Sequence, residues 1–245
     1  MTPSGPSGSP PGLTIIPVSG VGEIHPGDEI AALVADAARA QGTPLADGDC
    51  LVVTQKIVSK AEGRLVRLDP LDRDARRRLV ESESVRIVRV RGDLVISETA
   101  HGFVCANAGV DLSNVDSGWA ALLPIDADRS AKHVRDALRA RAGVDVAVIV
   151  SDTFGRPWRQ GLTDVAIGVN GITAIVDLRG QSDALGRELA VTEVAVADEI
   201  ASAAELVMGK AANVPVAIVR GLDASWFGEG SVRQLIRPPQ DDLFR

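Results

Sequence analysis

The chain has 245 residues, of which 45% are hydrophobic and 24% charged, and its net charge is −7 at pH 7. This balance excludes a nucleic-acid binder that works through a basic stripe. No run approaches roughly 18 apolar residues, so no membrane-spanning helix is expected. Any bound phosphate must therefore be held by a local group of cations or by metal ions.

Residues 1–12 are rich in Ser, Pro and Gly and lack the apolar core of a signal peptide, which predicts a disordered tail. We expect residues 13–245 to form one domain of a cytoplasmic protein. Cys50 and Cys105 lie in apolar runs that are typical of buried cysteines in a reducing compartment. A disulfide or a catalytic thiol is the alternative.

In the first half of the chain, hydrophobic periodicity predicts two helices. The first is capped by Asp28 and ends at Gly42, and the second is a charged helix over residues 72–82. Short apolar runs predict strands at residues 13–17, 51–54, 85–90, 94–97 and 103–106. We expect the last three to pair antiparallel, with a turn at residues 92–93.

In the second half, helices are expected at residues 130–142 and 191–208. Strands are expected at residues 122–125, 144–150, 165–169, 172–176 and 214–219. The run at residues 144–150 is almost continuously apolar and is the best candidate for a central strand. Because strands and helices do not alternate strictly, the predicted fold class is α+β, with mixed sheets and packed helices.

Standard phosphate-binding signatures do not match. Gly209-Lys210 lacks the upstream Gly and the downstream Ser or Thr of a Walker A loop, and Gly20-Val21-Gly22 lacks the third Gly of a dinucleotide fingerprint. The sequence therefore predicts neither a standard P-loop nor a Rossmann protein.

A dense polar segment, SDTFGRPWRQG at residues 151–161, follows the predicted central strand. Asp152 and Thr153 offer hard oxygen ligands that suit Mg²⁺ or Mn²⁺. Arg156 and Arg159 are suited to bind a phosphate or a substrate carboxylate. The alternative is a simple turn in which Asp152 caps the next segment.

Two further polar segments follow predicted strands. Residues 107–116 contain Asp111, a candidate second carboxylate that could share metal ions with Asp152. They also contain Asn114, a candidate hydrogen-bond donor to a phosphate or a base. Residues 53–64 contain Lys56 and Lys60, which would repel each other on one helical face unless an anion lies between them. Lys60 is the better phosphate candidate. The alternatives are a polar loop and a solvated charged surface.

The segment at residues 208–215 connects the last long helix to the last strand. Instead of a binding role, this segment could simply be the end of the helix, with Gly209 in the left-handed conformation and Lys210 favoured by the helix dipole. His25, His101 and His133 have no partner at metal-ligand spacing, so we expect surface or hydrogen-bonded polar residues.

Four motifs in order resemble those of the coenzyme F420-0:L-glutamate ligase family, the γ-glutamyl ligases of deazaflavin coenzyme biosynthesis. They are TQKIVSKAEGR at residues 54–64, AGVDLSN at 108–114, SDTFGRPWR at 151–159 and VTEVAVADEI at 191–200. Each motif alone is weak, but the four together are specific, and the resemblance runs from about residue 13 to the C-terminus.

The resemblance implies the family's own α+β fold, a homodimer, and GTP as co-substrate with two Mg²⁺ or Mn²⁺ ions and room for a K⁺ ion. It places Asp111 and Asp152 on the first metal and Thr153 on the second, with Lys60 as a further catalytic residue. The implied nucleotide contacts are Val21, Gly22, Glu23, Ile24, Gln55, Lys60, Asn114, Met208, Gly209, Lys210, Ala211, Ala212, Asn213, Val214 and Pro215.

This chain departs from the family pattern at two positions. Gln55 stands where many relatives have Ser, and Lys210 stands where some archaeal members have a metal-binding Gln. A protonated lysine cannot ligate a metal, so Lys210 is expected to contact phosphate only. In some actinobacterial relatives, a flavin-reductase-like domain begins at the position that corresponds to residues 241–245. The chain could therefore be a stand-alone ligase or one half of a fusion protein.

The expected function is thus a GTP-dependent ligase that adds L-glutamate to coenzyme F420-0 through γ-linked amide bonds, with an acyl-phosphate intermediate. A metal-dependent phosphohydrolase built on the same aspartates is one alternative. A nucleotide- or coenzyme-binding module without turnover is another. The number of glutamates added does not follow from the sequence.

Overall fold

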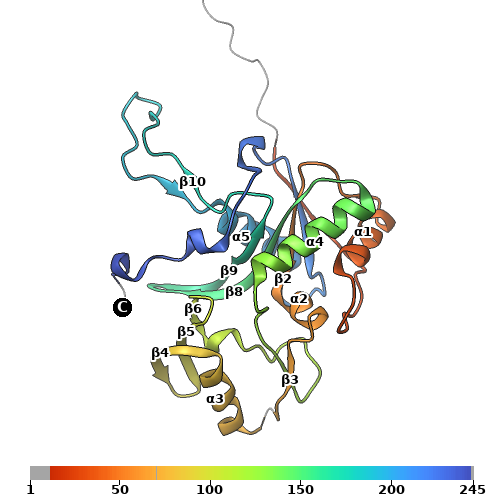
Figure 1. The fold of residues 1–245 in the computed structure, drawn as a ribbon, viewed down its shortest axis with the longest axis vertical. Helices are drawn as coiled ribbons and strands as arrows, with labels where there is room; N and C mark the ends of the chain where they lie inside the picture. Colours follow the sequence, from red (N-terminus) through yellow and green to blue (C-terminus); the bar gives the residue numbers. More distant parts are fainter. Residues whose placement is uncertain (1–11, 70, 244–245) are drawn as a thin grey trace, which may run out of the picture.

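A central sheet of five strands organises the molecule (Figure 1), and the computed structural model describes residues 12–69 and 71–243. The strand order is β1 (Thr14–Pro17), β12 (Val216–Arg220), β2 (Cys50–Thr54), β8 (Ala147–Arg156) and β9 (Arg159–Asn170). Only β2 and β8 pair in parallel. Residues 1–11 of the predicted tail lie outside the described residues.

Helices cover both faces of this sheet, because alternate residues of its buried strands point to opposite sides. Leu51 and Val53 pack on one face beneath α1 (Ile30–Ala40) and α4 (Ala127–Ala142). Cys50 and Val52 pack on the other face against α5 (Val196–Met208). The prediction of buried cysteines is confirmed for Cys50 and for Cys105, both of which are free thiols.

A smaller layer lies below the sheet in the view of Figure 1. It has a core of its own, which includes Leu68, Val80, Val95, Ala108 and Val110. Helix α2 (Gln55–Ala61) follows β2 and packs with the core of the central sheet. The elements of the smaller layer are β3 (Leu65–Arg67), α3 (Arg73–Ser82), β4 (Ser84–Arg91), β5 (Leu94–Thr99), β6 (Val104–Ala106), the 3-10 turn η1 (Asn107–Gly109) and β7 (Trp119–Ala121). Strands β4, β5 and β6 form one antiparallel sheet, and β3 pairs with β7.

An arm projects from the body of the protein between β9 and α5 (Figure 1). Its base is a two-stranded ribbon of β10 (Val176–Asp177) and β11 (Glu193–Val194), braced by Arg179, which forms ion pairs with Asp177 and Glu193. After β12 the chain forms the short turns η2 (Ala224–Trp226), η3 (Val232–Leu235) and η4 (Pro239–Asp241).

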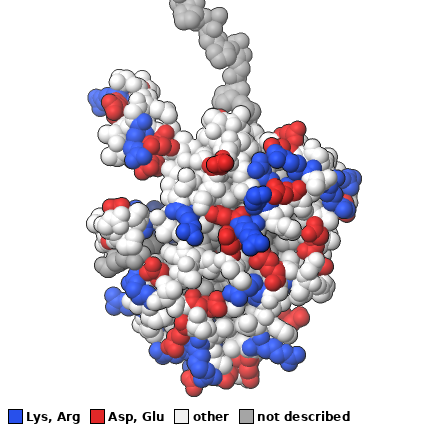
Figure 2. All heavy atoms as spheres, in the orientation of Figure 1, with Lys and Arg blue, Asp and Glu red and all other residues white. Residues whose placement is uncertain are grey.

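The predicted α+β class is confirmed, since helices and several mixed or antiparallel sheets make up the fold. No described helix has the length and apolar character needed to cross a membrane. On the face drawn in Figure 2, basic and acidic side chains are interspersed rather than segregated.

Several predicted elements were misplaced. The strand expected at residues 122–125 is wrong, because the pairing segment is β7, which ends at Ala121. The helix expected at residues 191–208 begins only at Val196, because Glu193–Val194 pairs with β10. Asp28 does not cap the first helix, since its carboxylate accepts a hydrogen bond from the N–H of His25 (2.7 Å).

A loop at a strand end was predicted for residues 151–161, and this prediction is wrong, because most of the segment belongs to β8 and β9. β8 continues to Arg156 and returns as β9 from Arg159, across a two-residue turn at Pro157 and Trp158. Trp158 takes a positive φ of 63°, which is the pattern of a type II turn with proline as its first central residue. The strand predicted at residues 165–169 is the inner half of this longer β9.

The strand predicted at residues 172–176 is also wrong. Gly171, with φ 84°, turns the chain out of β9. Beyond it, Ile172 makes one isolated bridge to Phe227, and regular pairing resumes only at Val176 in β10.

Candidate active site

Connecting segments converge with the β8–β9 hairpin at one edge of the central sheet. The chain leaves this edge after β1 and β2 and re-enters it at β12, because β12 is antiparallel to both. β8 passes the same edge, since Thr54 at the end of β2 lies opposite Ser151. The N–H of Thr54 donates to the carbonyl of Pro215 (2.9 Å) and ties two of these segments together. Predicted site residues far apart in the sequence therefore meet here.

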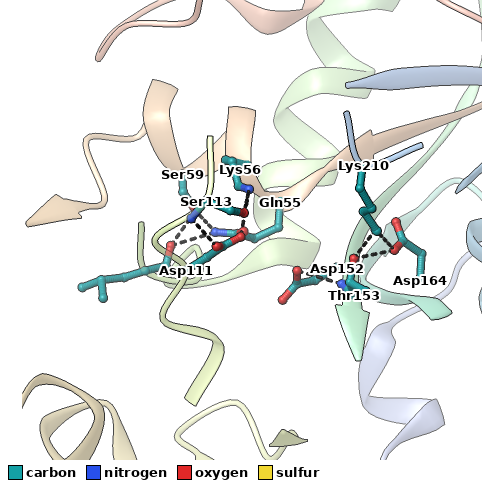
Figure 3. Close-up of polar contacts among 10 residues, drawn as sticks. Gln55, Lys56, Ser59, Asp111, Ser113, Asp152, Thr153, Asp164 and Lys210 are labelled. Carbon is teal, nitrogen blue, oxygen red and sulfur yellow. Dashed lines mark hydrogen bonds and ion pairs between the residues drawn. The ribbon is translucent and has the colours of Figure 1, made fainter. Parts of the chain in front are cut away.

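Asp152 lies on β8 directly after the buried Ser151, and Figure 3 shows it between Asp111 on one side and Asp164 on the other. Its carboxylate accepts a hydrogen bond from the backbone N–H of Thr153 (2.8 Å). Burial raises the pKa of Asp152 to about 7; this hydrogen bond opposes the shift, and the charges of Asp111 and Asp164 add to it. Such a carboxyl group is typical of a site that receives a cation.

Asp111 lies between η1 and β7 and belongs to the smaller layer. The ammonium of Lys56, on α2, contacts the Asp111 carboxylate (2.8 Å) and donates to the hydroxyl of Ser113 (2.8 Å). The N–H of Ser113 donates to the other Asp111 oxygen (2.7 Å). Burial opposes ionisation, but the hydrogen bonds from Lys56 and Ser113 hold the pKa of Asp111 below its ordinary value. Asp111 is therefore an anion fixed in position beside Asp152.

Asp164 forms a third carboxylate, on β9 opposite Thr153. It is only 2% exposed and accepts hydrogen bonds from the hydroxyls of Thr153 (2.6 Å) and Ser151 (3.2 Å). The ammonium of Lys210 contacts Asp164 (2.7 Å) and also donates to the Thr153 hydroxyl. Glu205 lies 3.4 Å from the same ammonium. Asp164 was not among the predicted site residues, because the hairpin that carries it back to Thr153 was not predicted from the sequence.

Gln55 begins α2, and its side chain points into the protein. Its amide donates to Ser59 (2.6 Å) and to the carbonyl of Leu122 (3.0 Å), and the Ser59 hydroxyl donates to the same carbonyl (2.6 Å). These bonds fasten α2 to the segment that follows β7. The nucleotide contact expected at Gln55 stays a prediction.

Lys60 lies one turn after Lys56 on α2. It is buried, and its ammonium forms an ion pair with the exposed carboxylate of Glu23. An anion was expected between the two lysines. Instead, each lysine has a carboxylate of its own, Asp111 for Lys56 and Glu23 for Lys60. Because Glu23 lies on the segment after β1, this ion pair links that segment to α2.

The remaining predicted nucleotide contacts occupy two segments at the same sheet edge. In the first, Val21 and Ile24 are buried, whereas Gly22 is exposed with φ 81°. The second runs from Met208, the last residue of α5, to Pro215 just before β12, and residues 209–213 are exposed. Gly209 has φ 59° and ψ 172°, so the left-handed helix end considered for it is not formed. Asn114 is exposed beside Asp111.

Arg156 and Arg159 lie at the tip of the β8–β9 hairpin. Both are exposed, and Arg156 donates to the carbonyl of Gln160 (3.3 Å). Arg156 lies three positions along the extended strand from Thr153, a span of about 10 Å. The structure therefore does not bring these arginines to the three carboxylates.

Metal binding at this site would need ligands besides the carboxylates. In residues 12–69 and 71–243, no three His, Cys, Asp or Glu side chains are grouped so that they could hold a metal ion. Mg²⁺ is commonly held by one or two carboxylates together with water and substrate phosphates. The histidines lie elsewhere: His101 bonds the carbonyl of Pro124 (2.9 Å), and His25 and His133 are exposed.

Comparison with known proteins identifies the family. The family model described as F420-0:Gamma-glutamyl ligase matches residues 20–221 of the chain. The chain belongs to this family. The match includes Asp111, Asp152, Asp164 and Lys210, so both groups of contacts at the sheet edge lie within it.

Relatives from archaea match over almost their whole length. A protein from Methanothermobacter thermautotrophicus named Coenzyme F420:L-glutamate ligase is 46% identical over 250 residues, which cover 96% of this chain and 99% of the relative. A protein of the same name from Methanopyrus kandleri is 44% identical over 256 residues, covering 97% and 100%. One from Archaeoglobus fulgidus is 38% identical over 247 residues, covering 95% and 96%. The resemblance predicted from the four motifs is confirmed.

Proposed function

We propose that this chain adds L-glutamate to coenzyme F420-0 through a γ-linked amide bond, with GTP as the source of energy. The names of its relatives support the ligase reaction. The observation that carries the proposal is the position of Asp152 between two ammonium–carboxylate pairs, Lys56 with Asp111 and Lys210 with Asp164. This arrangement offers both fixed positive charges and a free carboxylate where a polyphosphate and its cation would bind.

Amide formation from a carboxylate requires an activated acyl group. In the proposed first step, a carboxylate oxygen of F420-0 bonds to the γ-phosphorus of GTP, and the bond from that phosphorus to the β–γ bridging oxygen breaks, releasing GDP. In the second step, the amine of L-glutamate bonds to the acyl carbon, phosphate leaves, and the nitrogen loses a proton. Phosphoryl transfer depends mainly on positioning and charge stabilisation.

A divalent cation fits Asp111 and Asp152. Both offer hard carboxylate oxygens, and Asp152 has no ion-pair partner in the described part of the chain. When bound, Mg²⁺ or Mn²⁺ would offset negative charge on the phosphates. Lys56 would hold Asp111 in place, and Lys60 would add a positive charge when Glu23 gives way to the nucleotide. A K⁺ ion remains a prediction.

The segments at residues 21–24 and 208–215 are proposed to hold the nucleotide, with Asn114 and Gln55 beside them. The exposed Arg156 and Arg159 are proposed to bind anionic groups of F420-0 away from the reacting carboxylate. We also propose a homodimer. The projecting arm supports it, since Leu185 and Val191 on the arm are 79% and 85% exposed.

The proposal is tested by incubating the protein with F420-0, L-glutamate, GTP and Mn²⁺ and measuring glutamyl additions by mass spectrometry. We expect product only when all four are present. Phosphate release without F420-0 and glutamate would support a phosphohydrolase instead, and stabilisation by GTP without product would support a binding module. Size-exclusion chromatography with light scattering would test the dimer.

A matched pair of variants sharpens this test. Asp152→Asn removes the charge at the proposed site and should abolish turnover with the fold intact. Asp136→Asn makes the same chemical change at an exposed ion pair with Lys132 on α4 and should leave turnover unchanged. Full activity of Asp152→Asn would refute the role given to this carboxylate.

A further inference from the structure

The three carboxylates at the sheet edge differ in how their charge is balanced. Asp111 has the ammonium of Lys56, and Asp164 has the ammonium of Lys210. Asp152, between them, accepts a hydrogen bond from the N–H of Thr153 and forms no ion pair within residues 12–69 and 71–243. Asp152 is therefore the carboxylate left to take a divalent cation, whereas Asp164 is already paired with the ammonium of Lys210.

The Thr153 hydroxyl already makes two protein contacts on the side of Asp164. A threonine hydroxyl has one proton to donate and two lone pairs. The proton goes to Asp164 (2.6 Å), and one lone pair accepts from Lys210. A metal ion on the remaining lone pair would lie within a few ångströms of the Lys210 ammonium, and the two positive charges would repel.

Asp164 is occupied in the same way. One carboxylate oxygen accepts from Thr153 and Lys210, and the other accepts from the hydroxyl of Ser151 (3.2 Å). Asp164 and Thr153 lie on paired strands, and Asp164 is buried, so the place where the ammonium docks is rigid. Lys210 itself cannot ligate a metal, because an ammonium group has no lone pair.

We propose that the Lys210 ammonium is a built-in cation that takes the place of the second divalent ion, so that the site holds one divalent ion, on Asp111 and Asp152. This inference rests on the proposed function, which supplies the divalent ion and the nucleotide. It replaces the expectation that Thr153 holds a second metal. The third N–H of Lys210, which now faces Glu205 at 3.4 Å, is the one that can reach a phosphate oxygen.

The inference is tested by counting Mn²⁺ ions on the whole chain saturated with a non-hydrolysable GTP analogue. Equilibrium dialysis gives the number of ions per subunit. Electron paramagnetic resonance distinguishes an isolated Mn²⁺ from an exchange-coupled pair, because paired ions lie only about 4 Å apart. We expect one isolated ion per subunit in the wild-type protein.

Three variants isolate the role of Lys210. Lys210→Gln removes the ammonium and should admit a second, coupled ion beside Thr153 and Asp164. Lys210→Gln combined with Asp164→Asn removes the charge that would hold that ion and should return the count to one. Lys132→Gln makes the same change at an exposed lysine of α4 and should behave as the wild type.

The outcomes separate this inference from the proposed function. Two coupled ions in the wild-type protein would overturn the inference and leave the ligase proposal intact. A single ion in Lys210→Gln would also overturn it, because another group would then be excluding the second ion. Absence of any bound Mn²⁺ in the nucleotide-saturated wild type would refute the metal site of the proposed function, and the inference with it.

Discussion

The ion pair between Asp49 and Arg220 anchors the end of the central sheet opposite the candidate site. Asp49 precedes β2 and is 1% exposed. The guanidinium of Arg220, at the end of β12, donates to both of its oxygens at 2.7 Å and to the carbonyl of Pro44 at 3.0 Å. The hydrogen bonds to Asp49 raise the pKa of Arg220 above its ordinary value. Arg220→Met would leave Asp49 a buried carboxylate without a cation.

The expected loss of stability follows from this geometry. Removing one partner of a fully buried ion pair costs about 3–5 kcal/mol. Because the Arg220 side chain is 40% exposed, solvent screening lowers the estimate to roughly 2–4 kcal/mol. For a domain of this size, that loss corresponds to a Tm decrease of roughly 4–16 °C.

Thermal unfolding of Arg220→Met, followed by circular dichroism at pH 7, measures this loss. The double variant Asp49→Asn with Arg220→Met removes the buried charge as well and should regain about half of the lost stability. Arg77→Met breaks the exposed pair with Glu81 and should leave the Tm at the wild-type value, because solvent screens this pair. A Tm for Arg220→Met within 2 °C of the wild type, or a double variant less stable than the single one, would refute the reasoning.

Three further predictions concern the site and its support. Lys56→Met removes charge-assisted hydrogen bonds each worth about 1.5–3 kcal/mol, so kcat/KM for ligation should fall about 10- to 100-fold; an unchanged value would contradict the role of Lys56. Arg156→Gln with Arg159→Gln should raise KM for F420-0 and leave KM for GTP unchanged, and steady-state rates with each substrate varied distinguish the two. Gly168→Ala would place a Cβ 2.3 Å from the carbonyl oxygen of Ala127, so calorimetry should show a lowered Tm.

Elements with strong hydrophobic periodicity were predictable from the sequence. The runs that became β2 and the inner half of β8 were recognisable because both faces of these segments are buried and their residues are almost all apolar. The charged helix α3 was also placed correctly, with Asp72 as the cap that accepts from the N–H of Ala75 (2.8 Å). In these cases the local signal and the tertiary packing agree.

The outer part of the β8–β9 hairpin was not predictable in the same way. Beyond Asp152 the strands leave the core, so their residues alternate in no clear pattern of polarity, and their turn is Pro157-Trp158 rather than a Gly-containing pair. Because this hairpin was not predicted, the pairing of Asp164 with Thr153 was not predicted either. The carboxylate most closely tied to Lys210 is 46 residues from it in the chain, a separation that no local pattern reports.

The site depends on how the smaller layer is fastened to the central sheet, because Asp111 belongs to the first and Asp152 to the second. Two contacts fix this relation. The side chains of Gln55 and Ser59 hold the carbonyl of Leu122, which follows β7, and Phe103 beside β6 packs edge-on against Phe154 of β8.

Lys56 then completes the link, since it lies on the helix that leaves the sheet and bonds the carboxylate of the other layer. A shift between the layers would change the separation of Asp111 and Asp152, on which the proposed cation site depends. The polar contacts at this boundary, together with the apolar packing of Phe103 and Cys105 against the core of the central sheet, therefore set the geometry of the site.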